Sequence, residues 1–560
     1  MVTLSWLKHW LLHSRRIATG AGAALLLPGL LAACADPVQD RGADALVIAQ
    51  ETQAAWTRNF NPFLPNGAAR WPTRGGIYEP LLVYNRVAGT WVPWLADAWS
   101  WEDDGRSLRF HLRHGVRWSD GEALTADDVA FTFSLMKAHP ALDSVGVWGW
   151  LASVEALGDD EVVFHLSRPF SPGLEDVAEA PIVPRHVWRD VADPLAWDNP
   201  EPVATGPYTE VTTFTSQVWE LGRNPDYWQP GKPAIPTLRF PAFAGNDAAN
   251  LALVNGEVDW AGNFVPAVGR TFVARDPENH LSWSPPVEAT VYLYANTTVA
   301  PFADQRVREA LSLAIDRDRL VTVALDGLTH PADATGLSDA LAPFRDPTVT
   351  AAWTAHDPAA AATLLDAAGL PLEDGVRVGP DGPLTVELLV VAGWSDWIRA
   401  AQLVARDLGE VGVSVRVRPV DFSGWLDRVQ RGDFTLTIGW SSQGTTPYTG
   451  YRDLMGSQSA RPIGEASGGN WHRHASPTAD RLLAQVEATS DPEAQAALFD
   501  ALQATFAAEL PAIPLFPAPA WGVANTRLFV GFPTPEDPWV TLSPNHPPEP
   551  LLLLTTLAPR

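Results

Sequence analysis

Residues 115–133 read GVRWSDGEALTADDVAFTF, and this segment predicts a tight turn followed directly by a helix. Two glycines bracket the turn around Trp118. Thr125 then stands where the N-cap of a helix is expected. Asp128 follows at the third helical position, which Glu occupies in the usual capping box. The segment therefore defines both where the helix begins and what precedes it.

Short apolar strands and amphipathic helices surround this segment and predict an α/β protein. Residues 108–112 alternate between apolar and polar side chains, as a half-buried strand does. From residue 297 onward the pattern is more regular. A strand at 385–391, a helix at 397–408 and a strand at 413–417 form a βαβ unit, which requires parallel pairing. A chain of 560 residues is long enough for several domains.

Cys34 is the only cysteine of the chain and ends the sequence Leu-Ala-Ala-Cys. Basic residues and an apolar run of about 13 residues precede it, an organisation typical of a secretory signal peptide and too short for a membrane span. We expect residues 1–33 to be a lipoprotein signal peptide, Cys34 to carry the lipid, and residues 34–44 to be a tether. The mature protein would then lie on the extracytoplasmic side, with its lipid as the only membrane attachment.

The composition excludes several kinds of partner. The net charge is −26, so the surface would repel the phosphates of nucleic acids, and no nucleic-acid partner is expected. A single cysteine excludes an intramolecular disulfide, so folding outside the cell does not depend on oxidation. The chain holds 25 tryptophans, more than packing needs, and some of them are candidates for stacking against a ligand.

Motifs for catalysis and for cofactors are missing from the sequence. It has no phosphate-binding loop, no nucleophile elbow, no His-Glu-x-x-His motif and no cysteine pair. Residues 472–474, His-Arg-His, are interpreted as a solvated turn because no further metal ligands are evident. We therefore expect a protein that is not an enzyme and binds neither a cofactor nor a metal. A secreted glycoside hydrolase is the least favoured alternative. Such an enzyme needs a pair of carboxylates, and the abundant acids of this chain leave that possibility open, but no other catalytic motif supports it.

Several segments occur in the order found in one protein family. The segment 115–133 closely resembles the signature of the family 5 extracellular solute-binding proteins, the binding components of ABC importers. Further similar segments are 77–81, 93–96, 205–208, 223–228, 256–259 and 306–317. The resemblance implies an α/β fold of two lobes joined by a hinge, as in periplasmic binding proteins. An extra subdomain would be inserted in the first lobe, and the ligand would be enclosed between the lobes.

The resemblance also implies how the chain is divided. Lobe I is expected to comprise residues 45–85, 205–290 and 520–560. The inserted subdomain is expected at residues 86–204, and lobe II at residues 291–519. The protein is expected to be a monomer that closes around its ligand and delivers it to the permease subunits of an ABC importer.

The prediction of the ligand class rests on one position and on several segments that resemble one subgroup of the family. In the peptide-binding relatives an aspartate after the Gly-Trp end of a strand pairs with the ligand's amino terminus, whereas Thr446 stands there in this chain. A buried ammonium group without a carboxylate would be unstable. The segments 61–63, 393–397, 468–473 and 531–539 instead resemble the cello-oligosaccharide-binding subgroup. We therefore expect an oligosaccharide as the ligand, with an oligopeptide as the alternative.

Candidate ligand-binding residues follow from this expectation. A sugar presents C–H faces to aromatic rings and hydroxyl groups to polar side chains. Aromatic and polar residues at the carboxyl ends of predicted strands, or next to glycines, meet both needs. They are Trp440, Trp394, Asp396, Trp397, Asn470, Trp471, Gln443 and Asn61. Trp118 belongs to a segment shared by relatives with different ligands, so we expect it to be structural.

Overall fold

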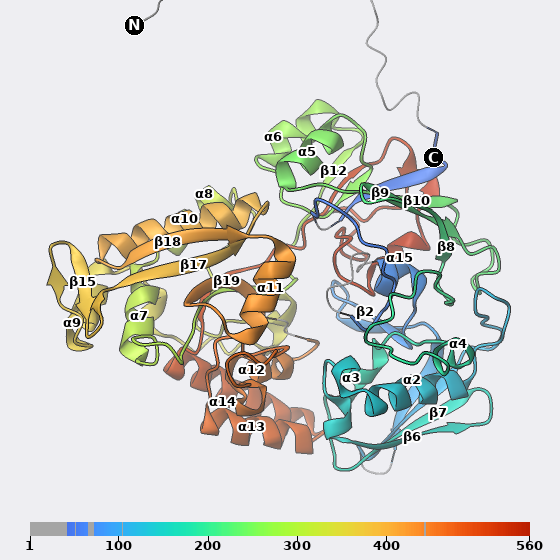
Figure 1. The fold of residues 1–560 in the computed structure, drawn as a ribbon, viewed down its shortest axis with the longest axis horizontal. Helices are drawn as coiled ribbons and strands as arrows, with labels where there is room; N and C mark the ends of the chain where they lie inside the picture. The colour runs from blue at the N-terminus through green and yellow to red at the C-terminus, as the bar shows by residue number, and fades with distance from the viewer. Residues whose placement is uncertain (1–41, 51, 65–71, 103–104, 442–443) are drawn as a thin grey trace, which may run out of the picture.

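The computed structural model describes residues 42–50, 52–64, 72–102, 105–441 and 444–560. The expected signal peptide, Cys34, most of the expected tether and Gln443 lie outside these residues. Figure 1 shows two parts of the molecule side by side, which we call lobe I and lobe II. Within the described residues, no helix has both the length and the apolar character that a membrane crossing requires.

Lobe I is built on a seven-stranded sheet whose strands come from three separate stretches of the chain. Their order is β12 (His280–Ser282), β21 (Val523–Asn525), β11 (Trp260–Ala261), β1 (Ala45–Ala49), β10 (Thr237–Pro241), β9 (Val218–Arg223) and β8 (Tyr208–Phe214). β1 is parallel to its neighbours β10 and β11. Leu46 and Ile48 of β1 enter the main core, while Val47 and Ala49 enter a second cluster with helix α5 (Asn246–Val254). Both faces of this central strand are therefore covered, which explains its unbroken apolar sequence.

An inserted subdomain contains a four-stranded antiparallel sheet. Its order is β4 (Ala96–Glu102), β5 (Ser107–Leu112), β7 (Glu161–Leu166) and β6 (Leu151–Leu157), so the strand predicted at 108–112 is confirmed. Helix α2 (Ala126–Ala138) packs against β6 and β7. Helix α3 (Gly173–Ala178) lies at the side of the subdomain that faces lobe II (Figure 1).

The predicted turn and helix at 115–133 form a structural hub of this subdomain. The capping box is confirmed, since the Thr125 backbone N–H donates to Asp128 Oδ2 at 3.0 Å. Trp118 is 1% exposed, and its Nε1 donates to the same oxygen at 3.3 Å. The other oxygen, Oδ1, accepts from the backbone of Arg185 at 2.9 Å, at the start of helix α4 (Arg185–Trp188). One carboxylate thus joins the turn, α2 and α4.

Three other segments that resemble the family meet at one buried carboxylate. Glu79 is 0% exposed. Its Oε1 accepts from Trp94 Nε1 at 2.6 Å and from the Tyr227 hydroxyl at 2.7 Å, and its Oε2 accepts from Trp228 Nε1 at 3.2 Å. Burial raises the pKa of Glu79 to about 7, although the donated hydrogen bonds act in the opposite direction. The resemblance of these three segments to the family is therefore explained by their structural role, because together they form one buried hydrogen-bond network.

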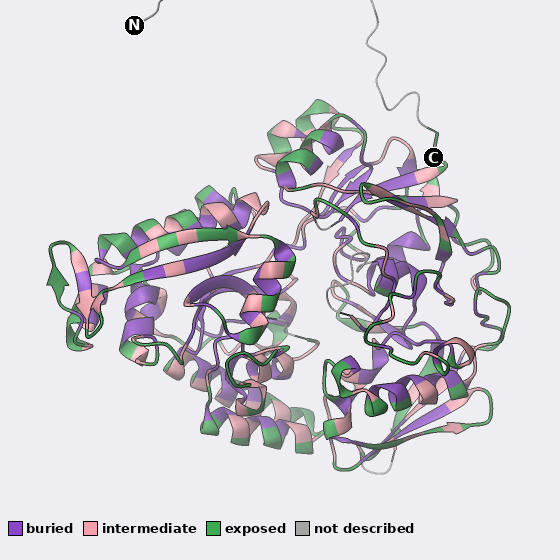
Figure 2. Cartoon of the chain, viewed as in Figure 1, coloured by how far each residue is buried: buried purple, intermediate pink, exposed green. Residues whose placement is uncertain are grey.

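Lobe II is built on a five-stranded sheet. Its order is β18 (Ser414–Val420), β17 (Thr385–Val391), β19 (Leu436–Ser441), β13 (Thr290–Ala295) and β20 (Ile513–Pro517). β17 and β18 are parallel and are connected by helix α10 (Ser395–Glu410), so the predicted βαβ unit is confirmed. The other long helices of this lobe are α7 (Gln305–Ala314), α8 (Arg317–Ala324), α9 (Pro358–Ala367), α11 (Phe422–Arg431), α12 (Pro447–Met455), α13 (Pro477–Ala488) and α14 (Pro492–Glu509). Figure 2 shows that β17 and β19 are mostly buried, whereas the edge strand β18 contains only exposed and intermediate residues.

Shorter elements complete the two lobes. The strand pairs are β2 (Leu82–Asn85) with β3 (Thr90–Pro93), and β22 (Phe529–Val530) with β23 (Ala558–Pro559). A small sheet at the outer end of lobe II contains β14 (Leu372–Glu373), β15 (Val376–Gly379) and β16 (Gly382–Pro383). Lobe I also contains the short helices α6 (Val268–Thr271) and α15 (Pro550–Leu554).

Two segments connect the sheets of the lobes. Residues 283–289 lead from β12 to β13, and residues 518–522 lead from β20 back to β21. The two segments are hydrogen-bonded to each other, for example from the Ala518 N–H to the Ala289 carbonyl at 2.7 Å. A paired connection of this kind suits a hinge, because a few residues can absorb the rotation of one lobe against the other.

Candidate ligand-binding site

A cavity of about 330 Å³ lies between the lobes. Asn263 and Asn545 of lobe I line it, and Trp440 of lobe II faces the same space. The inserted subdomain contributes Glu175 and Glu179 from α3 and the residue that follows it. Because all three parts of the molecule face one space, a rotation about the connecting segments would assemble or open the site.

An aromatic wall from lobe II forms one side of the cavity. Gly393 has a φ of +86°, which turns the chain from β17 into α10 and places Trp394 at the N-cap of that helix. Trp397 follows one turn later, and Trp440 comes from the end of β19. The ring of Trp440 lies 6.3 Å from that of Trp394 and 6.0 Å from that of Trp397, measured between centroids. Both Trp394 and Trp440 are half-buried, so part of each ring remains accessible.

More deeply buried aromatic rings hold this wall in place. Trp425 of α11 is fully buried and stacks on Trp440 at 5.3 Å. Trp471 meets the edge of Trp440 at 5.6 Å, and Phe422 stacks on Trp394 at 5.7 Å. The rings that line the cavity are therefore pre-organised by a second layer, which limits the entropy lost when a ligand stacks on them.

The structure brings together half of the residues that the sequence singled out. Trp394, Asp396, Trp397 and Trp440 line the cavity. Trp471 is buried behind Trp440 and does not line it.

Two predicted residues use their side chains to hold the backbone of the protein. Asn470 is buried, has a φ of +47°, and donates from Nδ2 to the carbonyls of Gly456 and His474. Asn61 is buried in lobe I and donates to the carbonyls of Pro194 and Trp197 at 2.8 and 2.9 Å. Neither asparagine lines the cavity.

A carboxylate that the sequence did not single out lies beside the loop after β19. Glu175 reaches from the subdomain to lobe II, where its Oε2 accepts from the backbone N–H and from the hydroxyl of Thr445, each at 2.9 Å. Thr445 precedes Thr446, the position at which the sequence has no acid. Glu175 and Thr445 are 270 residues apart in the chain, so no local pattern could have paired them.

Two further acids of the cavity are shifted toward their neutral forms. Partial enclosure raises the pKa of Glu179 to about 7, and the nearby Arg86 opposes this shift. One oxygen of Glu179 accepts from the backbone N–H of Tyr84 at 3.0 Å. Asp396 is 4% exposed, and burial raises its pKa to about 6. Both side chains would become more acidic if a cationic ligand group entered the cavity.

Lobe I supplies polar atoms that have no hydrogen-bond partner among the described residues. They include Oδ1 of Asn263, Oδ1 of Asn545 and Nη1 of Arg86, which lies 3.6 Å from Glu549 Oε2. His546 Nε2 faces Glu288 Oε2 at 3.2 Å. Buried polar atoms of this kind lose free energy unless they gain a partner, so they favour a ligand with its own polar groups.

The lobes touch at two places around the cavity. At one, the Asn246 N–H donates to the Gly393 carbonyl at 3.0 Å, and a Cβ on Gly245 would lie only 3.0 Å from Gly393 Cα. At the other, the subdomain contacts α13: the Ser171 N–H donates to the Glu487 carbonyl at 3.0 Å, and Arg168 pairs with the Glu487 carboxylate at 2.6 Å. The first contact is made by backbone, although elsewhere between the lobes the Arg399 guanidinium lies over the ring of Phe264 at 5.1 Å. The second contact combines a backbone hydrogen bond with an ion pair.

This geometry, a ligand-sized cavity enclosed by two hinged lobes, defines a binding protein, and the comparisons with known proteins agree. Residues 90–461 match the family model of the bacterial extracellular solute-binding proteins, family 5 (middle). The chain belongs to this family. It is the substrate-binding component of an ABC importer and acts outside the cytoplasm. The α/β fold of periplasmic binding proteins that the sequence predicted is confirmed.

Individual relatives carry names for different ligands. A nickel-binding periplasmic protein of Escherichia coli is 29% identical over 69% of this chain and 74% of its own. A probable di/tripeptide-binding protein of Pseudomonas aeruginosa is 26% identical over 76% of this chain and 82% of its own. A crystal structure of a periplasmic oligopeptide-binding protein from Thermotoga maritima, with mannohexaose bound, has a TM-score of 0.83 and 26% identity and covers 92% of this chain and 99% of its own.

Proposed function

We propose that this protein captures short peptides and delivers them to the permease of its ABC importer. The observation that carries the proposal is the pair of carboxylates, Glu175 and Glu179, that line the same cavity as the aromatic wall. A peptide has an ammonium group that pairs with such carboxylates, and Arg86 on the same side of the cavity can receive its carboxylate. Names of relatives support a peptide ligand more than the oligosaccharide that the sequence favoured.

The position of Glu175 removes the sequence argument against peptides. That argument was the missing acid at Thr446. Glu175 brings a carboxylate to the neighbouring Thr445 from another element, so a ligand ammonium at this place would not be left unpaired. The cavity volume of about 330 Å³ lies near the lower end of the range of about 300–1,000 Å³ typical of small-ligand sites, which favours a short peptide.

An oligosaccharide is the second candidate ligand. Trp394, Trp397 and Trp440 offer apolar ring faces on which sugar C–H groups can pack, and Asp396 and Asn263 offer partners for hydroxyl groups. The Thermotoga maritima relative with bound mannohexaose supports this candidate as well. Glu175 and Glu179 could also accept hydrogen bonds from sugar hydroxyl groups, but a neutral sugar leaves their negative charge unpaired.

Lipid attachment at Cys34 completes the proposed function. A tethered monomer stays close to its permease, which raises the local concentration of the loaded form. Cys34→Ser abolishes the attachment, and ligand affinity is retained because the cavity lies in the folded lobes.

A ligand screen tests the proposal directly. We expect di- to pentapeptides to raise the melting temperature of the purified protein, because a ligand that binds only the folded state stabilises it. The same peptides with an acetylated amino terminus are matched controls and should stabilise it far less, since they lack the ammonium group. If only cello-, xylo- or manno-oligosaccharides stabilise the protein, the peptide proposal is wrong and an oligosaccharide is the ligand. Product release from a chromogenic glycoside would contradict a purely binding role.

The pH dependence of affinity separates the two ligand classes. An ammonium group near Glu179 favours the ionised carboxylate, so binding must remove a proton from Glu179 below its pKa of about 7. We expect peptide affinity, measured by titration calorimetry, to increase from pH 5.5 to 7.5. Glu179→Gln should weaken peptide binding and flatten this dependence. An affinity that falls as pH rises would contradict the assignment of an ammonium group to this place.

A further inference from the structure

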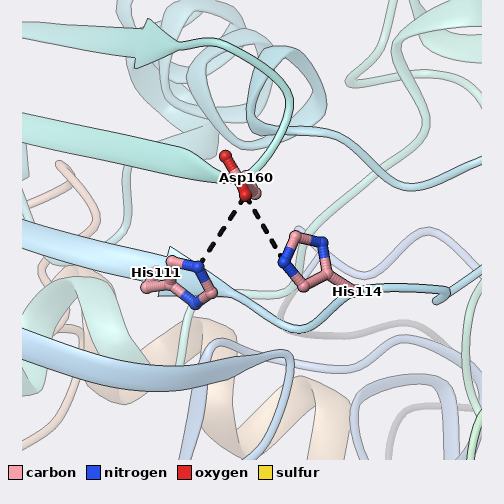
Figure 3. A group of neighbouring side chains, drawn as sticks. All are labelled: His111, His114 and Asp160. Carbon is pink, nitrogen blue, oxygen red and sulfur yellow. Dashed lines mark ion pairs between the residues drawn. The ribbon is translucent and has the colours of Figure 1, made fainter.

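A second cluster of ligand-type side chains lies in the inserted subdomain, and none of its members lines the cavity. His111, His114 and Asp160 each offer one atom, and these three atoms lie within 4.8 Å of one another. Nε2 of His111 is 3.8 Å from Asp160 Oδ2, and Nε2 of His114 is 3.5 Å from the same oxygen. Figure 3 shows both imidazole rings directed at the carboxylate. The sequence alone, from which no metal site was expected, does not connect these residues.

A carboxylate behind the cluster fixes the orientation of one ring. Asp97 Oδ1 lies 2.6 Å from Nδ1 of His111. A carboxylate can only accept, so Nδ1 carries the hydrogen and the neutral ring presents the lone pair of Nε2 toward Asp160. Histidines that bind metals commonly have this arrangement, in which an outer carboxylate holds the ring and increases its basicity.

Of the three residues, His111 lies in strand β5, whereas His114 and Asp160 lie in turns next to the sheet. His111 is paired with Ala98 of β4 on one side and with Glu161 of β7 on the other. The Asp160 carbonyl accepts from the Leu112 N–H at 2.6 Å, and the preceding carbonyl accepts from the first residue of α2 at 2.8 Å. The cluster therefore requires little rearrangement of the chain to form a site.

The charges around the cluster favour a cation. Asp97, Asp160 and Glu161 all act on His111, and of these Glu161 is already paired with Arg109 at 2.9 Å. The intervening cation, Arg113, is turned away: its Nε donates to the Trp94 carbonyl at 3.0 Å, and its guanidinium lies over the ring of Trp228 at 4.7 Å. Arg113 lies between the two histidines in sequence, but its guanidinium group does not occupy the space that a metal ion would take.

We propose that His111, His114 and Asp160 bind a divalent transition-metal ion of the Zn²⁺ class, with Asp97 as the residue that positions His111. Zinc ligands at about 2.0–2.2 Å in a tetrahedron are about 3.3–3.6 Å apart, close to the observed 3.5 and 3.8 Å. Two imidazoles and one carboxylate leave the fourth position to water. A bound ion would join the end of β5 to the turn between β6 and β7.

The test measures Zn²⁺ binding to the full chain, produced without a histidine tag and freed of metal with a chelator. We expect titration calorimetry to show that the wild-type chain binds Zn²⁺. The affinity for Zn²⁺ should fall at least tenfold in His114→Ala and in Asp160→Asn. Asp97→Ala should weaken it by about 10- to 100-fold. Co²⁺ should give the intense visible absorption of four-coordinate sites, and this signal should disappear in His114→Ala.

His165→Ala is the matched control. His165 lies on the same sheet as His111, and its side chain is about as exposed as that of His111. It pairs with Glu155 at 3.2 Å and does not belong to the cluster. Its loss should leave Zn²⁺ affinity unchanged. The proposal is overturned if the wild-type chain binds no Zn²⁺, if His114→Ala and Asp160→Asn bind it as the wild type does, or if His165→Ala is equally weakened. His114 is 75% exposed in its side chain, so circular dichroism should show His114→Ala to be folded.

Discussion

Glu79→Ala is expected to lower the free energy of unfolding by about 3 to 5 kcal/mol, more than any other substitution proposed for this protein. The substitution removes the acceptor of three donors, the indoles of Trp94 and Trp228 and the hydroxyl of Tyr227. Each donor then loses its acceptor, and two of the three, Trp94 and Tyr227, are buried. Urea unfolding monitored by circular dichroism measures the change. Glu278→Ala, at an exposed acid of the same lobe, should change stability by less than about 0.5 kcal/mol.

Glu79→Gln separates the charge of this residue from its hydrogen bonds. Folding raises the pKa of Glu79 from 4.5 to about 7, so between these values the folded chain binds more protons than the unfolded chain. Stability from this group is therefore fully present below about pH 4.5 and is lost as pH rises through about 7, by about 3 kcal/mol in all. We expect the difference in stability between pH 5.5 and pH 8 to be smaller in Glu79→Gln. An unchanged difference would show that Glu79 does not titrate in the folded protein between these pH values.

Trp440→Ala is expected to weaken ligand binding by about 10- to 100-fold, since an aromatic face worth about 1.4 to 2.7 kcal/mol is lost from the wall of the cavity. Trp440 contacts the other rings of the wall, so its loss also loosens Trp394 and Trp397. Titration calorimetry with the best ligand from the screen gives the affinity. The expectation holds for a peptide or for a sugar, because both present apolar faces to the ring.

Two companion variants make this result interpretable. Trp440→Phe keeps an apolar ring and should lose less than tenfold in affinity. Trp101→Ala removes a tryptophan that is 37% exposed on β4 and lies outside the cavity, so it should bind normally. If Trp440→Ala binds normally while remaining folded, Trp440 supports lobe II without contacting the ligand.

Much of the fold was predictable because its signals are local. The capping box at Thr125 and the βαβ unit around α10 are each encoded within a few tens of residues, and the structure contains both. The same holds for the aromatic wall, because Trp394 lies shortly after β17 and Trp440 lies at the end of β19. A residue at the carboxyl end of a strand in an α/β sheet is a reasonable candidate for ligand binding on the strength of its position alone.

The acids that the inserted subdomain contributes to the cavity were not predictable, for the opposite reason. Glu175 and Glu179 come from the inserted subdomain and reach the site only because the lobes face each other, so their sequence context gives no sign of a ligand. The two predicted asparagines show a different limit of sequence-based prediction. Asn61 and Asn470 are residue types that suit a ligand, but each satisfies carbonyl groups of its own chain, and residue type alone does not distinguish the two uses.

The two unequal contacts between the lobes give the cleft a direction. Where Gly245 meets Gly393, a Cβ on either glycine would lie only 3.0 Å from the Cα of the other, so the two backbones are in close contact there. On the other side, Arg168 meets Glu487 and Glu175 meets Thr445, and water and salt ions compete for such charged contacts. Contacts of the second kind are the easier ones to break, so we expect the cleft to open on the side of Arg168 and Glu175 when the lobes rotate about the connecting segments.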